Sequence, residues 1–158
     1  MGSLVELLLA RQGIGELSLL IPTLAQSSQQ GKDIFWIAPP YQPYAPALHA
    51  GGIKLERFCW ISTENTHEQL WAMEQVLAAS AIAVLWRSHI QDKALRRLQL
   101  AAERGQTLGF LYRHSKYRQQ PSAAHLRLLL DTEGHNGLLQ LNLLKYRKRS
   151  VNILPIKA

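Results

Sequence analysis

LVELLLARQGIGELS, residues 4–18, is the stretch that decides the fold. Its first six residues are an apolar run that predicts a buried strand. A turn at residues 12–15 follows, and from Glu16 to about residue 30 apolar residues recur at helical spacing. Pro22 falls inside this run, so we expect it in the first turns of the helix or at a kink. A buried strand followed by a glycine-containing turn and a helix is the repeating unit of α/β proteins.

The turn stands where a P-loop would bind phosphate. In a P-loop, glycines surround the phosphates, a Lys reaches the terminal phosphates, and a Ser or Thr hydroxyl holds magnesium. Gly13 and Gly15 are present here, but Glu16 stands at the Lys position and Leu17 at the Ser/Thr position. A carboxylate at the start of a helix favours the helix dipole and repels phosphate. The sequence therefore predicts a degenerate P-loop that is filled from within.

The other requirements of catalysis are also missing from the sequence. The apolar run 82–86 ends in Trp86 and Arg87, where a nucleotide hydrolase needs an acid to hold magnesium. The six histidines form no i, i+4 pair and have no cysteine neighbour, which argues against a metal site. We therefore expect a protein that is not an enzyme and that uses no cofactor, metal or small-molecule substrate.

The rest of the chain alternates strands and helices and then changes pattern. Strands are predicted at 33–38, 58–61, 82–86 and 107–112, and helices at 66–79 and 92–103, with a short helix ending at residues 51–52. After a polar, basic loop at 113–122, the runs 126–131 and 138–146 predict a hairpin, followed by a last strand at 151–155. This order predicts one domain, residues 1–158, in which a mostly parallel sheet with flanking helices carries a C-terminal antiparallel extension.

Composition is typical of one domain with its own core, since 47% of the 158 residues are hydrophobic and 18% are charged. No apolar run reaches the roughly 18 residues of a membrane span, and no signal peptide is apparent. The lone Cys59 lies between Phe58 and Trp60, which predicts a buried thiol in a reducing cytoplasm.

Positive charge is concentrated in the second half of the chain. The net charge is +7, but residues 1–86 carry four basic and seven acidic side chains, whereas residues 87–158 carry fourteen basic and four acidic ones. One basic half predicts a polyanion or an acidic protein surface as partner. The alternative is a basic face that serves only solubility.

Three surfaces are candidates for contact with DNA or a protein partner. The first is the basic tail, whose cations could bind phosphates while its tyrosine stacks on a base, or could merely protect an edge strand. The loop after the fifth strand could extend it. The second is the Pro–Tyr loop, residues 39–46, which supplies either rigid contact area or packing on its own sheet. The third is the helix 92–103, with Leu95, Leu98 and Leu100 facing the sheet. The candidate residues are Lys145, Tyr146, Arg147, Lys148 and Arg149 in the tail, Arg113, Lys116 and Arg118 in the loop, Tyr41 and Tyr44, and Arg96 and Arg97.

Four segments carry a resemblance to a known family. GIGELSLLIPTLA (13–25), WIAPPYQPYAPAL (36–48), ALRRLQLAAE (94–103) and GFLYR (109–113) resemble the ImuA family of translesion-synthesis accessory proteins. The same segments are more distantly similar to SulA, the cell-division inhibitor. The resemblance extends from residue 3 to about residue 150.

The resemblance implies a RecA-like three-layer fold in a cytoplasmic protein of the DNA-damage (SOS) response. An ImuA-like protein would be a non-catalytic accessory of translesion synthesis, with RecA or an inactive Y-family polymerase homologue as partner and DNA as a further one. A SulA-like protein would instead bind the tubulin-like division protein and block its polymerisation. The Pro–Tyr loop and the basic tail favour the first alternative. The compact length, with no segment before the first strand, favours the second.

Overall fold

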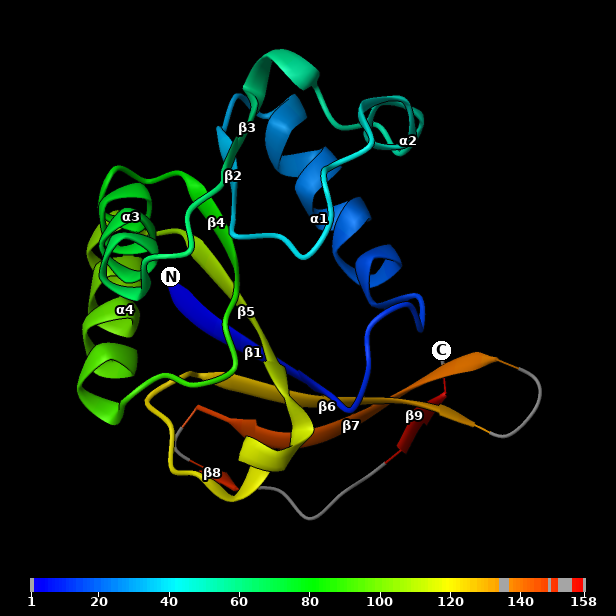
Figure 1. Ribbon diagram of the computed structural model, residues 1–158, viewed down its shortest axis with the longest axis vertical. Coiled ribbons are helices and arrows are strands. Elements are labelled where there is room, and N and C mark those ends of the chain that lie inside the picture. Colours follow the sequence, from blue (N-terminus) through cyan, green and yellow to red (C-terminus); the bar gives the residue numbers. More distant parts are fainter. Residues whose placement is uncertain (1, 134–136, 148, 151–154, 158) are drawn as a thin grey trace.

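A single sheet with helices on both faces forms the protein (Figure 1). The computed structural model describes residues 2–133, 137–147, 149–150 and 155–157. In chain order the elements are β1 Ser3–Leu9, α1 Glu16–Gln29, β2 Ile34–Ile37, α2 Ala45–Ala50, the 3₁₀ turn η1 Leu55–Arg57, β3 Phe58–Ile61, α3 Thr66–Ala78, β4 Ile82–Trp86, α4 Asp92–Gly105, β5 Leu108–His114, the 3₁₀ turn η2 Ser115–Gln119, β6 Leu126–Glu133, β7 Leu138–Tyr146, β8 Arg149–Ser150 and β9 Pro155–Lys157.

The sheet is mixed. Its strand order is β3-β2-β4-β5-β1-β6-β7-β8, and β9 pairs with β7. The pairs from β3 to β6 are parallel, whereas β7 is antiparallel to β6, β8 and β9. An α/β fold with a mixed sheet is thereby confirmed.

The strand β1 lies inside the sheet, between β5 and β6. Its residues alternate between two hydrophobic clusters, because successive side chains of a strand point to opposite faces. Leu4 faces the cluster under α3 and α4, whereas Val5 and Leu7 face the cluster under α1 and α2. Figure 1 shows these two helix pairs on opposite sides of the sheet. The run at residues 4–9 predicts a buried strand, and the structure shows this strand buried on both faces.

The observed elements differ from the predicted ones at a few places. The strand β5 continues to His114, and η2 forms within the stretch expected to be a loop. Pro22 lies inside α1, which continues past it to Gln29. Most of the strand predicted at 151–155 lies outside the described residues, and β9 begins at Pro155. The expectation of a buried Cys59 is wrong, because β3 is the edge strand of the sheet and leaves this thiol exposed.

Candidate functional site at the carboxyl ends of the strands

A groove of about 550 Å³ lies at the carboxyl ends of β1, β4 and β5. It is lined by residues at or just after the ends of these strands, among them Arg11, Arg87 and His114, and by Tyr41 from the Pro–Tyr loop. Ligands of open α/β sheets characteristically bind at this edge, outside the carboxyl ends of the strands. We call it the carboxyl-edge groove.

The turn after β1 is occupied by the side chain of Glu16. One carboxylate oxygen accepts a hydrogen bond from the Gly13 N–H at 3.1 Å and the other from the Ile14 N–H at 2.9 Å. Gly13 and Gly15 have φ values of 79° and 90°, which a residue with a side chain rarely adopts. The N–H groups that a P-loop would turn toward phosphate thus already bind an internal anion.

An aromatic cluster supports the floor of the groove. Trp86 stacks on Tyr112 with ring centroids 5.2 Å apart, and Trp36 meets Trp86 edge to face at 5.1 Å. The Tyr112 hydroxyl donates a 2.8 Å hydrogen bond to the Glu16 carbonyl. Burial, and then the charge of Glu16, raise the pKa of Tyr112 far above its ordinary value of 10.0. The phenol therefore stays protonated and ties β5 to the start of α1.

The Tyr112→Phe variant is expected to lose about 1–2 kcal/mol of stability at pH 8, because the buried Glu16 carbonyl loses its donor. In the parent protein, stability falls as the pH rises above 10, because Tyr112 ionises only in the unfolded chain. The variant lacks this loss, so the difference between the two proteins should shrink between pH 10 and pH 11. Urea unfolding at pH 8, 10 and 11 measures it. The exposed Tyr146 gives the control, Tyr146→Phe; a constant difference for Tyr112→Phe across this range would contradict the assignment.

A second, apolar cavity of about 570 Å³ adjoins the groove. The Pro–Tyr loop forms one side of this cavity, and the turn before α1 with Leu17 forms another. Tyr41 and Tyr44 are 77% and 70% exposed, so their rings do not pack on their own sheet. Pro43 restricts the backbone between them, which keeps the two rings available at low entropic cost.

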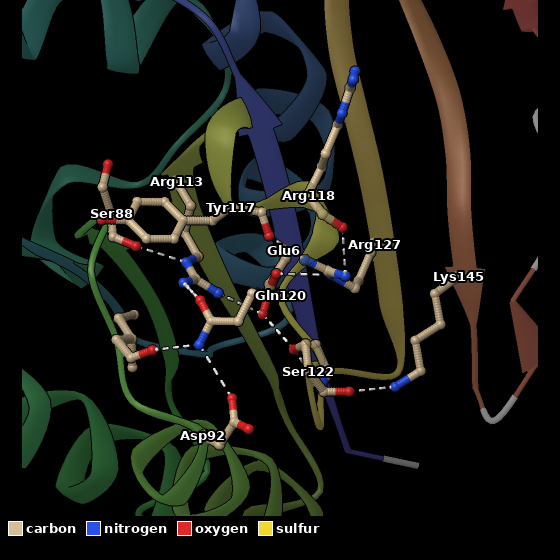
Figure 2. Close-up of polar contacts among 12 residues, drawn as sticks. Glu6, Ser88, Asp92, Arg113, Tyr117, Arg118, Gln120, Ser122, Arg127 and Lys145 are labelled. Carbon is tan, nitrogen blue, oxygen red and sulfur yellow. Dashed lines mark hydrogen bonds and ion pairs between the residues drawn. The ribbon is translucent and has the colours of Figure 1, made fainter.

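A buried ion cluster lies beneath η2 (Figure 2). Glu6 is fully buried, and its carboxylate accepts hydrogen bonds from Nη1 of Arg113 at 3.2 Å and from Nε of Arg127 at 2.9 Å. The parallel register of β1 and β6 places Glu6 directly opposite Arg127. The Ser122 hydroxyl also donates to Glu6. One carboxylate thus serves two buried guanidinium groups.

The remaining donors of the two arginines hold the segment that covers them. Arg113 donates to the Ser88 carbonyl at 2.9 Å and to the Gln120 side chain at 2.7 Å. Arg127 donates to the carbonyls of Tyr117 and Arg118. Buried charges are tolerated when they are paired and their hydrogen bonds are satisfied. The cluster therefore fixes η2 on the sheet.

These contacts correct the expectations for two of the basic residues. Arg113 is 1% exposed and cannot meet a partner, because Glu6 holds it inside the fold. Lys145 donates to the Ser122 carbonyl, and burial and the neighbouring Arg127 lower the pKa of its ammonium group. Lys116 and Arg118 are exposed on η2.

The described part of the basic tail is the end of β7 and the turn after it. Tyr146 is 52% exposed, and the guanidinium of Arg147 lies 5.4 Å from the centre of its ring. Arg149 begins β8, and Lys148 lies outside the described residues. Tyr146 pairs with Leu126 at the start of β6, so the described part of the tail lies at the edge of the sheet opposite the carboxyl ends of β1, β4 and β5.

On α4, the structure corrects the position of one leucine. Leu95 and Leu98 are buried against the sheet as expected, but Leu100 is 54% exposed. It follows Leu95 by five residues, which turns it by about 140° from the buried face. Arg96 is exposed, and Arg97 pairs with Glu74 of α3.

The sequence analysis missed Glu6, Arg127 and the groove residues Arg11, Arg87 and His114. For Glu6 a signal was present, since a carboxylate within the apolar run LVELLL must be buried and needs a basic partner. Each of these groove residues lies at or just after the end of a strand. Only the strand order shows that these three strand ends are neighbours. Within the described residues no cluster of three metal-ligating side chains occurs. No helix there is long and apolar enough to span a membrane.

Fold and site together define an α/β protein that offers a groove and exposed aromatic side chains for binding. Comparison with known families narrows this class: the model of the family "Cell division inhibitor SulA" matches residues 3–109. The chain therefore belongs to the SulA family.

Individual relatives agree with this assignment. The chain is 30% identical over 122 residues to the cell division inhibitor SulA of Edwardsiella piscicida, covering 75% of this chain and 68% of that protein. It is 28% identical over 111 residues to the SulA of Photorhabdus laumondii, covering 69% and 63%. The match thus spans about three-fifths to two-thirds of these relatives' length. The crystal structure of SulA from Pseudomonas aeruginosa shares the fold, with a TM-score of 0.56 and 24% identity over 70% of this chain and 97% of that one.

The expectation of an ImuA family member is wrong, because the family model, the curated relatives and the solved structure are all SulA. RecA and an inactive polymerase homologue were expected as partners on that resemblance alone, and they are withdrawn with it. The excess of positive charge lies outside the residues that match the family model. Residues 3–109 carry nine basic and nine acidic side chains, so the net charge of +7 comes entirely from residues 110–158.

Proposed function

We propose that this protein inhibits cell division by binding the tubulin-like division protein and blocking its polymerisation. Its membership in the SulA family over residues 3–109, a span that holds α1–α4 and the Pro–Tyr loop, carries the proposal. It acts in the cytoplasm during the DNA-damage response. Its scaffold would be a RecA-like three-layer arrangement with a mostly parallel sheet. The helices on both faces of the sheet are consistent with this proposal.

The Pro–Tyr loop is the contact surface we favour for this partner. Tyr41 and Tyr44 are the two most exposed large hydrophobic side chains among the described residues. They stand beside an apolar cavity in which Leu17 of α1 is also partly exposed. Aromatic anchors next to a pocket are the usual centre of a protein interface. Binding here would cover the two tyrosine rings, which the fold itself leaves exposed.

The Tyr41→Ala/Tyr44→Ala variant is expected to weaken inhibition at least tenfold, because each ring is placed as an interface anchor. The measurement is GTP-dependent assembly of the purified division protein, followed by sedimentation at increasing inhibitor concentrations. Both tyrosines are exposed, so the melting temperature should not change.

The matched control is Tyr146→Ala, which removes an exposed tyrosine from β7. It should inhibit like the parent protein. Absence of inhibition by the parent protein would refute the function, whereas loss with Tyr146→Ala and not with the double variant would move the interface to the basic tail.

A further inference from the structure

The carboxyl-edge groove collects two arginines and a histidine from the ends of three strands. Arg11 follows β1, Arg87 follows β4 and His114 ends β5, and all three line the same groove. β4, β5 and β1 are consecutive neighbours in the sheet. Since neighbouring strands lie about 4.8 Å apart, these groups span about 10 Å along the sheet edge. The result is a row of cationic and imidazole groups and not a single charged point.

Three carboxylates near the groove are already engaged, whereas Glu64, in a neighbouring pocket that Arg87 also lines, has no ion pair among the described residues. Glu16 accepts two backbone hydrogen bonds, and Asp92 accepts one from Gln120. Glu6 neutralises Arg113, the other arginine that lines the groove. Among the described residues, neither Arg11 nor Arg87 forms an ion pair with a carboxylate. Their charge is therefore available to an anionic ligand.

Aromatic rings alternate with these charged groups. Tyr41 stands exposed at the groove wall, and Trp86 is partly exposed where it stacks on Tyr112. Farther along the same edge, Nζ of Lys116 lies 5.3 Å from the centre of the Tyr117 ring, and His89 lies 6.0 Å from it. Proteins bind single-stranded nucleic acid in this way: cations lie along its phosphate backbone, and its bases stack on aromatic rings.

We propose that the carboxyl-edge groove binds single-stranded nucleic acid, with phosphates at Arg11 and Arg87 and a base on Tyr41. A single strand fits better than a duplex, because only unpaired bases expose a face on which a ring can stack. An acidic protein segment would use the same charges but would gain little from the rings. This inference is independent of the proposed inhibition of cell division.

The test is fluorescence anisotropy of a 5′-fluorescein-labelled dT15 strand with the intact chain, at 50 to 200 mM salt. The Arg11→Ala/Arg87→Ala variant should bind at least tenfold more weakly at 50 mM salt. Two lost phosphate contacts should also make the slope of log affinity against log salt shallower by about 1.4. Tyr41→Ala should weaken binding about tenfold with the slope unchanged, because stacking releases no counterions.

The matched control is Lys32→Ala/Arg104→Ala. Lys32 precedes β2 and Arg104 precedes β5, so this variant removes two charges from the opposite, amino-end edge of the parallel strands. It should bind dT15 like the parent protein. No binding by the parent protein, or equal losses in both double variants, would overturn the proposal. Binding of a labelled poly-glutamate peptide would also overturn the proposal, if that binding depends on Arg11 and Arg87 and if dT15 does not displace the peptide.

Discussion

Replacing Glu6 by alanine is expected to destabilise the protein by about 3–5 kcal/mol, because two buried guanidinium groups lose the carboxylate that pairs with both of them. Domains of this size have about 5–15 kcal/mol of total stability. The variant should therefore be largely unfolded at 37 °C or should unfold at a much lower urea concentration. Urea denaturation followed by circular dichroism measures the change.

Two further variants separate the loss of charge pairing from the loss of volume. Glu74→Ala breaks the pair with Arg97, whose side chain is 59% exposed, and should cost less than 1 kcal/mol. Glu6→Leu combined with Arg113→Met and Arg127→Leu removes the buried charges together, and should recover much of the stability lost in Glu6→Ala. If Glu6→Ala unfolds within 1 kcal/mol of the parent protein, the cluster does not hold η2 as described.

Replacing Gly105 by alanine should also destabilise the protein, by about 3 kcal/mol. A Cβ at this position would lie 1.8 Å from the Leu77 carbonyl oxygen, where the end of α4 meets the end of α3. The obstacle is backbone, so the two helices must separate. An alanine would favour an isolated helix by about 1 kcal/mol, which is too little to offset this clash. Thermal unfolding gives the comparison.

Gly51→Ala is the matched control for Gly105→Ala. Its Cβ would meet the side-chain atom Cγ2 of Ile21 at 2.6 Å, but the nearest backbone atoms lie 3.4 Å away. Its φ is −74°, which alanine adopts without strain. A loss well below that of Gly105→Ala is expected, and similar losses in both variants would show that the contact with α3 is not what excludes a side chain.

The helices and strands could be predicted from the sequence because the apolar residues of each one recur at the spacing of a helix or a strand. The run LVELLL gave a buried strand, and the spacing after Glu16 gave α1. The end of β5 was missed because Arg113 is polar, although it lies at 1% exposure. Hydropathy cannot show that a polar residue is buried when its partner, Glu6, is 107 residues away.

The candidate site was predictable only in part, for the same reason. The Pro–Tyr loop was visible as a motif, and its two tyrosines are exposed in the structure. The carboxyl-edge groove depends on strand order, which places Arg11 and Arg87 on one edge although 75 residues lie between them. The family was misjudged because the resemblance rested on short segments, whereas the family model compares residues 3–109 together.

The position of β1 has a consequence for synthesis. β1 leaves the ribosome before β5 and β6, the strands with which it pairs, and these are made about a hundred residues later. At about 5–20 residues per second, β1 waits roughly 5 to 20 s for residues 108–114. Through that time Leu4, Leu7 and Leu8 have no partner strand, in a chain whose helices can already form. The nascent chain thus carries an apolar segment without its partner strands until β5 and β6 have been made.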